Sequence, residues 1–454
     1  MRRGRGARPP VLGIEQPRGH PPDRSHAGRD GRGLSKAAVS VIVVSRGRPD
    51  HLRLCLTALT RQDHPLFEVI LVADRPGLAQ RPDLQIKRVA FDEANISQAR
   101  NLGIANAAGR IIAFIDDDAV AEPTWLSRLT APFAAGAVIA ATGWTRDRDG
   151  FRWQSRAARM TRAGFPQLFE TADMETLMLA PQDGAPVSTL GTNCAFRAAA
   201  LRAIGGFDPL FAYHLDESDV NMRLAQLAPE ALTAIVPTAQ VIHARAGSAQ
   251  RNAAAVPVEL SAIGRSAALF ARRYGGASPA AELQARTRRR LIRHMLDGQL
   301  DPLRIPNVMA TLNAGLADGA IAPLPSPPAD RHDTAPAFLP MPQSAGGHIV
   351  LTGWHWQAQD LRRKARAFSA TGQTVTLILL SPSLLPHRLR YTEGGWFEQM
   401  GGLWGPSEPG DPAGRRWRAA ERLDRETKLA QFRRNSTEFR GVEAPRLSRN
   451  AEPA

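Results

Sequence analysis

The first part of the chain alternates between short, continuous apolar runs and stretches whose apolar residues recur with helical spacing. The continuous runs predict buried strands, and they cover residues 39–45, 67–74, 85–91 and 111–115. Helical stretches separate these runs: one starts near Pro49, and one covers residues 95–109, where Gly109 is expected to end the helix. Strands and helices that alternate at this spacing predict a doubly wound α/β sheet with parallel neighbours.

The alternation continues more loosely in the next hundred residues. Further strands are predicted over residues 138–144, 187–197 and 233–243. A short helix after the second of these strands is expected to end at Gly205-Gly206, and Val220 and Leu224 share one face of the helix that follows. Residues 145–186 are polar and irregular with a weak helical signal, and we interpret them as an insertion on the substrate side.

Composition and pattern divide the chain into six segments. They are a disordered basic tail (1–36), the α/β domain (37–250), an extension of three helices (251–321), a Pro/Ala-rich linker (322–346), a small β-α-β unit (347–408) and a charged tail (409–454). The small unit has too few residues to fold alone, so we expect it to pack on another part of the chain. Its Trp354 and Trp356 are either a sugar-stacking surface or core residues. In the tail, residues 417–435 predict one amphipathic helix.

Charge and cysteine content narrow the partners and the compartment. The formal net charge of +15 favours anionic partners, namely nucleotide phosphates, an anionic membrane face or nucleic acid. The 2 cysteines, Cys55 and Cys194, predict no disulfide framework and fit a reducing compartment. No apolar run is long enough to span a bilayer, and the basic N-terminus lacks the apolar segment of a secretory signal. We therefore expect a cytoplasmic protein, with peripheral contact at the inner face of the membrane and no specific binding to nucleic acid.

Three consecutive aspartates, Asp116 to Asp118, end the strand at residues 111–115. The carboxyl edge of an open α/β sheet is where such folds bind ligands, so these carboxylates should face a ligand site. Three like charges repel one another unless a cation neutralises them, and carboxylate oxygens suit Mg²⁺ or Mn²⁺. The alternative is that the aspartates only cap a helix that opens near Pro123 and Trp125.

Other acidic residues are predicted at the same edge. Asp74 ends the second strand, and Asp216, Glu217 and Asp219 open a helix. Each has a structural alternative: Asp74 as a turn residue, and Asp216 as an N-cap with Asp219 in the first helical turn. Asp219 and Arg223 are spaced i, i+4 and are expected to form a supporting ion pair.

Taken together, these segments resemble family 2 glycosyltransferases of the GT-A fold over residues 37–245. The motifs that carry the resemblance occur in the family's order: VSVIVVSRGRPDHLRLCLTAL, VILVAD, SQARNLGIANAAGRIIAFIDDD, GTNCAFR, LRAIGGFDPLF and DESDVNMRL. The resemblance implies a doubly wound mixed sheet of the nucleotide-diphospho-sugar transferase type. It also implies an inverting, metal-dependent transfer of a hexosyl or deoxyhexosyl group from a nucleotide-diphosphate sugar to an acceptor hydroxyl.

On the donor side, the resemblance implies five residues for nucleotide-sugar binding: Ser45, Asp74, Arg100, Asp116 and Asp117. Ser45 would border the base, Asp74 would hydrogen-bond the base or ribose, and Asp116 would face the ribose. Arg100 would contact the phosphates, or it is a solvated helix residue without such a role.

The metal and acceptor sides follow from the same resemblance. Asp118 would bind the divalent cation, Mn²⁺ or Mg²⁺, that bridges the two phosphates. His243 is either a third metal ligand or a histidine without that role. Glu217 would be the catalytic base, with Asp216 as the alternative, because a neighbouring carboxylate raises the pKa of either acid. Gly205-Gly206 would let the acceptor approach the backbone closely.

Two departures from the family pattern limit the prediction. Asp74-Arg75 stands where an aspartate pair is common in the family, so we expect the contacts that recognise the base to differ here. The chain has no QxxRW-like segment after DESD and no predicted membrane span, both of which processive synthases of the family usually have. We therefore expect transfer of one sugar to a saccharide or lipid-linked acceptor, in bacterial surface glycan or glycoconjugate synthesis. The rival hypothesis is a non-catalytic binding protein built on a family 2 domain.

Overall fold

The computed structural model describes residues 37–171, 174–248, 250–328, 336–342, 346–412 and 414–435. The predicted basic tail and the last part of the predicted charged tail lie outside these residues. The division of the chain into six segments stays a prediction, although the elements within the described residues can be compared with it.

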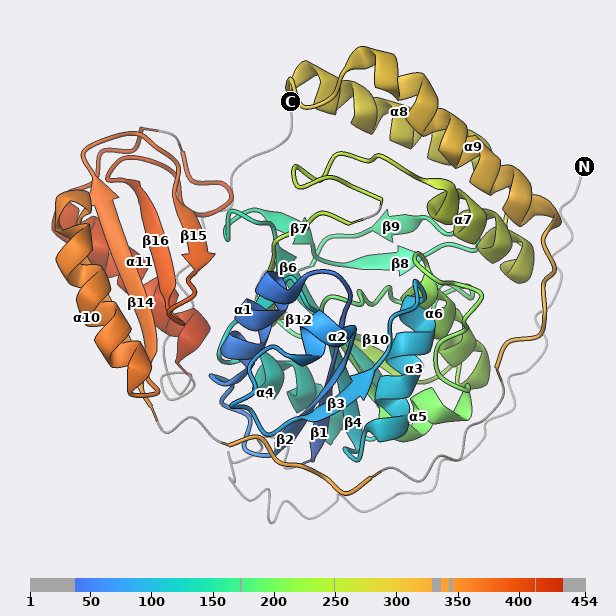
Figure 1. Cartoon of the computed structure of the whole chain (residues 1–454), viewed down its shortest axis with the longest axis horizontal. Coiled ribbons are helices and arrows are strands. Elements are labelled where there is room, and N and C mark those ends of the chain that lie inside the picture. The colour runs from blue at the N-terminus through green and yellow to red at the C-terminus, as the bar shows by residue number, and fades with distance from the viewer. Residues whose placement is uncertain are drawn as a thin grey trace, which may run out of the picture. The chain divides into compact units, whose positions relative to one another are not determined.

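A ten-stranded sheet forms the centre of the predicted α/β domain, with strand order β10-β12-β6-β11-β4-β1-β2-β3 (Figure 1). Four neighbours run parallel: β4 (Ile111–Asp116), β1 (Val39–Ser45), β2 (Phe67–Ala73) and β3 (Lys87–Ala90). On the other side of β4, the antiparallel strand β11 (Cys194–Arg197) separates it from the parallel pair β6 (Val138–Arg146) and β12 (Leu232–His243). The mixed, parallel-rich sheet confirms the predicted fold class.

Helices cover both faces of this sheet because its central strands are apolar on both sides. Val41 and Val43 of β1 pack in one cluster with α1 (Pro49–Leu59) and α4 (Trp125–Thr130). Ile42 points the opposite way, into a second cluster. The helices that contribute to this second cluster are α3 (Ile96–Asn106), α5 (Ala198–Ala203) and α6 (Asp216–Leu227). This alternation between neighbouring residues produces the doubly wound arrangement.

Gly109 has a different role from the one predicted. Helix α3 ends at Asn106, before Gly109 is reached. A Cβ atom on Gly109 would lie 2.6 Å from the backbone nitrogen of Ser40, so this position needs glycine for close approach to β1. The prediction that Gly109 closes the helix was therefore wrong. Close contact between two backbone segments and the end of a helix both favour glycine, so the sequence did not distinguish the two roles.

The predicted irregular insertion at residues 145–186 contains short strands. They are β7 (Trp153–Ser155), β8 (Ala158–Met160), β9 (Pro166–Leu168) and β10 (Leu177–Leu179). β7 pairs with β6 and β10 pairs with β12, so the segment extends the main sheet at two places. The weak helical signal was misleading here, since strands of three residues are too short to show a period.

The three predicted helices of the extension are present as α7 (Ser261–Tyr274), α8 (Ala280–Leu296) and α9 (Ile305–Ile321). Helices α7 and α9 pack closely through glycines: a Cβ on Gly315 would lie 1.9 Å from the carbonyl oxygen of Ser261. None of the helices in the described residues is long and apolar enough to cross a membrane.

The predicted C-terminal β-α-β unit is present and is part of a larger sheet. It consists of β13 (His348–Trp354), α10 (Ala358–Ala370) and β14 (Thr374–Ser381). Two strands that the pattern did not reveal, β15 (Arg388–Tyr391) and β16 (Phe397–Gly402), complete a four-stranded sheet of order β13-β14-β16-β15 (Figure 1). The predicted amphipathic helix in the tail is present as α11 (Ala419–Arg434).

This C-terminal sheet packs against the α/β domain, as its small size led us to expect. One apolar cluster contains residues of both parts: Ala58, Phe151, Ile242, Leu389, Tyr391 and Phe397. Polar contacts add to it, since Arg61 of the α/β domain donates a 2.8 Å hydrogen bond to the carbonyl oxygen of Ser369 in α10. The C-terminal sheet is therefore joined to the domain that carries the aspartate cluster.

Candidate functional site

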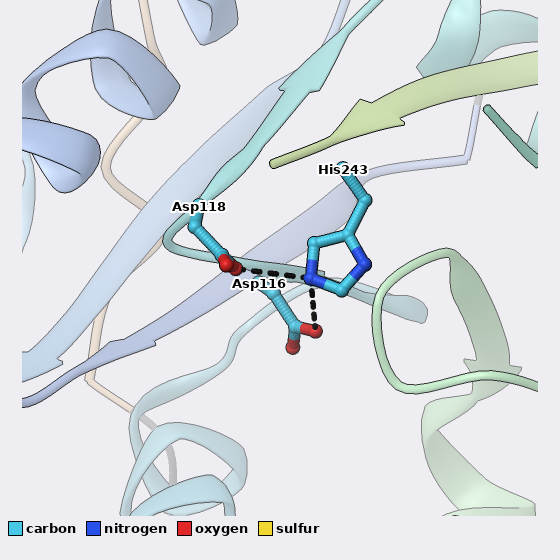
Figure 2. Close-up of side chains that lie close together, drawn as sticks. All are labelled: Asp116, Asp118 and His243. Carbon is cyan, nitrogen blue, oxygen red and sulfur yellow. Dashed lines mark ion pairs between the residues drawn. The ribbon is translucent and has the colours of Figure 1, made fainter. Parts of the chain in front are cut away.

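Three side chains at or just after the ends of strands meet at the carboxyl edge of the main sheet. Asp116 is the last residue of β4, and Asp118 lies in the turn before β5 (Ala119–Ala121). Strand β5 pairs with the end of β12, where His243 lies opposite Ala119. Asp116, Asp118 and His243 each offer a potential ligand atom, and these atoms lie within 4.8 Å of one another. Figure 2 shows the two carboxylates close to the imidazole. His243 is therefore close enough to the two aspartates to act as the third ligand that the sequence left open.

The chemistry of this group fits a divalent cation. His243 Nε2 lies 3.2 Å from Asp118 Oδ1 and 3.9 Å from Asp116 Oδ2. On the other side of the ring, Nδ1 lies 3.0 Å from the side-chain oxygen Oε1 of Gln154. An Nδ1–H that donates to this oxygen leaves the Nε2 lone pair facing the carboxylates. A lone pair that faces two carboxylates is repelled unless a cation lies between them. Carboxylates together with imidazole suit Mn²⁺, and the oxygens also suit Mg²⁺.

The middle aspartate, Asp117, points in another direction. Its side chain is fully buried, and it accepts a 2.6 Å hydrogen bond from Ser45 and lies 2.5 Å from a guanidinium nitrogen of Arg48. Burial, partly offset by Arg48, raises the pKa of Asp117 to about 7. Asp117 therefore joins β1 to the metal turn and exposes no side-chain surface to a ligand. Its predicted role in nucleotide-sugar binding, and that of Ser45, stay predictions.

Asp118 is held in its charged form. Burial alone would raise its pKa, but Arg48, the backbone N–H of Ala246 and, when no cation is bound, a protonated His243 outweigh this effect and hold the pKa well below its ordinary value. The N–H of Ala246 donates a 2.7 Å hydrogen bond to Oδ2, and Arg48 approaches the same oxygen at 3.2 Å. The sequence analysis missed Arg48, although its position directly after the first strand was a usable signal.

A cavity of about 640 Å³ opens beside the metal group, in the range that binds small ligands. Its walls come from segments that follow β1, β2, β3 and β12, and they include Arg48, Asp74, Asp92 and Arg251. Asp74 accepts hydrogen bonds from the backbone N–H groups of Gly47 at 2.7 Å and Gly77 at 2.9 Å. Asp74 therefore stabilises the turn after β2, which is the alternative role that the sequence suggested for it, and it also lines the cavity.

Arg100 connects the metal group to the acidic helix α6. Its guanidinium pairs with Asp216, lies 3.9 Å from Glu217 Oε2, and lies 3.6 Å from Asp116 Oδ1. The side chain is only 5% exposed, and its guanidinium carbon lies 5.1 Å from the ring centre of Phe207. The interpretation of Arg100 as a solvated helix residue was wrong. Its role with phosphates stays a prediction, since three carboxylates share its charge.

Glu217 has the electrostatic environment of a proton acceptor. Burial and the charge of Asp216 raise the pKa of Glu217 well above its ordinary value, and Arg100 offsets only part of this rise. Asp216 is not the N-cap of α6, because Leu215 occupies that position with a left-handed φ of 63°. A leucine in this conformation is strained, and such strain is common beside functional sites.

The remaining predicted residues have structural partners. Asp219 and Arg223 form the expected ion pair at 2.7 Å, and Tyr274 of α7 donates a 2.6 Å hydrogen bond to Asp219. Gly205 and Gly206 have left-handed φ angles of 74° and 76°, and a Cβ on Gly206 would lie 2.4 Å from an oxygen of Asn101. Packing against α3 accounts for these glycines without a ligand, so their acceptor-side role stays a prediction.

Comparison with known proteins defines the class of this domain. Residues 40–205 match the family model described as Glycosyl transferase family 2. This segment of the chain is therefore similar to family 2 glycosyltransferases, which agrees with the resemblance that the motifs carry.

Two relatives with assigned names show similarity over part of the chain. EpsH of Bacillus subtilis (strain 168), itself named only provisionally as a glycosyltransferase, is 31% identical over 104 residues, which cover 21% of this chain and 30% of EpsH. Glycosyltransferase AglE of Haloferax volcanii is 30% identical over 101 residues, covering 20% of this chain and 33% of AglE. The matched segment thus spans about a third of each relative.

Solved structures with similar coordinates are more distant in sequence. Mannosyltransferase PcManGT of Pyrobaculum calidifontis, in complex with GDP-Man and Mn²⁺, is 17% identical with a TM-score of 0.36, over 63% of this chain and 87% of that protein. GalNAc-T7 with UDP, GalNAc and Mn²⁺ is 15% identical with a TM-score of 0.38, over 46% of this chain and 44% of that protein.

Proposed function

We propose that this protein is an inverting, metal-dependent glycosyltransferase that moves one sugar from a nucleotide-diphosphate sugar to an acceptor hydroxyl. The observation that carries the proposal is the position of Arg100. One guanidinium lies within 4 Å of Asp116 on the metal side and of Asp216 and Glu217 on the other side. This proximity supports the proposal, because glycosyl transfer requires acidic residues on both the donor side and the acceptor side of one reaction centre.

The donor side is formed by the metal group and the adjacent cavity. Asp116, Asp118 and His243 would hold Mn²⁺ or Mg²⁺. Such a cation offsets the charge that develops on a departing nucleoside diphosphate. Arg48 and Arg251 line the cavity and approach Asp118 at 3.2 and 3.7 Å, so they add positive charge where phosphates would lie. The nucleoside would occupy the cavity beside Asp74.

On the acceptor side, Glu217 takes the proton from the acceptor hydroxyl as its oxygen attacks the anomeric carbon. A carboxylate with a raised pKa is a more effective base near neutral pH than one with an ordinary pKa. Asp216 holds Arg100 and raises the pKa of Glu217. A single displacement from the face opposite the leaving diphosphate inverts the anomeric centre, through a transition state with oxocarbenium character. We include a hexosyl or deoxyhexosyl donor and a saccharide or lipid-linked acceptor in the proposal.

The test is a panel of nucleotide sugars with and without Mn²⁺, in which nucleoside diphosphate release and product mass are measured. Asp118→Asn should abolish metal-dependent release, and Glu217→Gln should bind the donor but transfer nothing. Asp360→Asn, an exposed carboxylate on α10, is the matched control and should leave turnover unchanged. Normal turnover in Asp118→Asn refutes the metal assignment, and donor binding without turnover in the wild type supports the binding-protein alternative.

The pH–rate profile distinguishes the two candidate bases. Because the charge of Asp216 raises the pKa of Glu217, Asp216→Asn should move the acidic limb of the profile to lower pH while transfer continues. If transfer instead continues in Glu217→Gln and stops in Asp216→Asn, the base is Asp216.

A further inference from the structure

The carboxyl edge of the C-terminal sheet carries exposed apolar residues next to exposed arginines. Strands β13, β14 and β16 are parallel, with Trp354 opposite Leu380 and Ser381 opposite Gly402, so all three end at the same edge (Figure 1). The segments after these strands therefore emerge together. This edge lies outside the site described above, and the inference below does not rest on sugar transfer.

The apolar part of this edge consists of Trp356, Leu384 and Leu385, with exposed fractions of 61%, 62% and 64%. The indole of Trp356 stacks on Trp354, with ring centres 5.1 Å apart. The loop that carries the leucines is held to the end of β16, because Gly402 donates a 2.9 Å hydrogen bond to the carbonyl oxygen of Leu385. Three large exposed apolar side chains on a fixed framework are typical of a binding surface.

The tryptophans beneath this surface connect it to the arginines. Trp354, Trp404 and Trp417 contact one buried apolar cluster of the C-terminal sheet. The guanidinium carbon of Arg415 lies 4.0 Å from the ring centre of Trp417. Arg415, Arg416 and Arg418 are exposed, and no carboxylate of the described residues lies within ion-pair distance of them. We define the edge patch as Trp356, Leu384, Leu385, Arg415, Arg416 and Arg418.

We propose that the edge patch binds the surface of an anionic lipid bilayer. Leu384 and Leu385 would enter the boundary between headgroups and acyl chains, and Trp356 would lie at the level of the headgroups, where indole rings are favoured. The three arginines would pair with anionic headgroups. This charge complementarity distinguishes a bilayer from an uncharged saccharide, which would stack on Trp356 but would gain nothing from the arginines.

A second surface with arginines and exposed apolar residues lies around the end of α8. It contains Arg288, Arg289 and Arg293, and Leu296 is 76% exposed. Here, however, the apolar residue is next to the exposed Asp297, whose charge an anionic surface repels. This surface therefore serves as a charge-matched control.

The test is co-sedimentation of the full chain with phosphatidylcholine vesicles that contain or lack phosphatidylglycerol, at low and raised salt and without any nucleotide sugar. The wild type should bind only the anionic vesicles, and more weakly as salt increases. The variant Arg415→Gln/Arg416→Gln/Arg418→Gln should lose roughly fivefold in binding per arginine, about 100-fold in total. Leu384→Ser/Leu385→Ser should also reduce binding, whereas Arg288→Gln/Arg289→Gln/Arg293→Gln should change it much less.

Circular dichroism of each variant shows whether it is folded, which is expected because all substituted side chains are exposed. Equal binding to neutral and anionic vesicles overturns the proposal. A larger loss in the α8 variant than in the edge-patch variant also overturns it. So does binding of soluble glycans that depends on Trp356 when no vesicle binding is seen.

Discussion

A buried ion pair joins the last helix to the segment that follows the metal turn. Glu122 comes directly after β5, and its carboxylate accepts hydrogen bonds of 2.8 and 2.9 Å from Arg434 near the end of α11. Each of the two side chains is 1% exposed. Arg434 also donates a 3.1 Å hydrogen bond to Thr376, and its guanidinium carbon lies 4.0 Å from the ring centre of Phe397.

Removing one partner of this pair should destabilise the protein strongly. Glu122→Leu leaves the guanidinium of Arg434 buried without its hydrogen-bonded carboxylate, and Arg434→Met leaves the carboxylate of Glu122 buried without its hydrogen-bonded guanidinium. Breaking a buried pair in this way costs about 3–5 kcal/mol of unfolding free energy. The double variant leaves no buried charge, and replacing a whole buried pair by apolar residues is often neutral. We therefore expect it to lie within about 2 kcal/mol of the wild type.

Urea denaturation of the full chain, followed by tryptophan fluorescence, measures all four corners of this double-mutant cycle. The exposed pair of Asp360 and Arg363 on α10 is the control, and Asp360→Asn should leave the urea midpoint unchanged. Single variants within about 1 kcal/mol of the wild type would contradict the reasoning. An additive double variant would show that the two side chains do not stabilise each other.

Three further predictions concern the site and its supports. Arg100→Met removes a positive charge that lowers the pKa of Glu217. The acidic limb of the pH–rate profile should therefore move to higher pH, with at least about a tenfold loss of rate at neutral pH. An acidic limb at the wild-type pH would show that Arg100 does not act on Glu217. Tyr274→Phe removes the hydrogen bond to buried Asp219 and should cost about 1.5–3 kcal/mol in urea denaturation, and no loss would contradict this. Burial lowers the pKa of His348 to about 3. Below the ordinary value of 6.5, the unfolded chain therefore binds a proton at this residue that the folded chain does not bind. The protein consequently becomes less stable as the pH decreases from 6.5. Between pH 7 and pH 5, His348→Gln should lose up to about 2 kcal/mol less unfolding free energy than the wild type. Equal losses in the two proteins would refute the lowered pKa of His348.

The core and the metal group were predictable because their signals are local in the sequence. Apolar runs that end in aspartate mark β2 and β4, and His243 ends β12 in the same way. The carboxyl ends of parallel strands share an edge, so these side chains could be expected to meet without knowledge of any long-range contact. The sequence could not show which aspartate points inward, because Asp117 is turned away by Ser45 and Arg48.

The C-terminal third was less predictable because its stability depends on partners far away in the chain. Helix α11 was predicted as amphipathic, yet the pattern did not show that its charged residues Arg422, Glu426, Arg433 and Arg434 are buried. Arg422 and Glu426 pair locally at i, i+4, whereas Arg433 and Arg434 pair with Glu408 and Glu122, which no local pattern identifies. Strand β16 was missed for a related reason, since Glu398 and Gln399 are polar residues buried inside the sheet.

The distance along the chain between Glu122 and Arg434 has a consequence for biosynthesis. The two residues are 312 positions apart, so at ordinary rates of translation the ribosome adds Arg434 roughly 15 to 60 s after Glu122. Late in that interval the nascent chain already contains the strands of the α/β sheet, but Glu122 still lacks Arg434, the partner that hydrogen-bonds its carboxylate. We therefore expect the region around the aspartates to remain loosely ordered until synthesis of the last helix is finished, and ribosome-bound chains that stop before Ala419 to be cleaved there by protease.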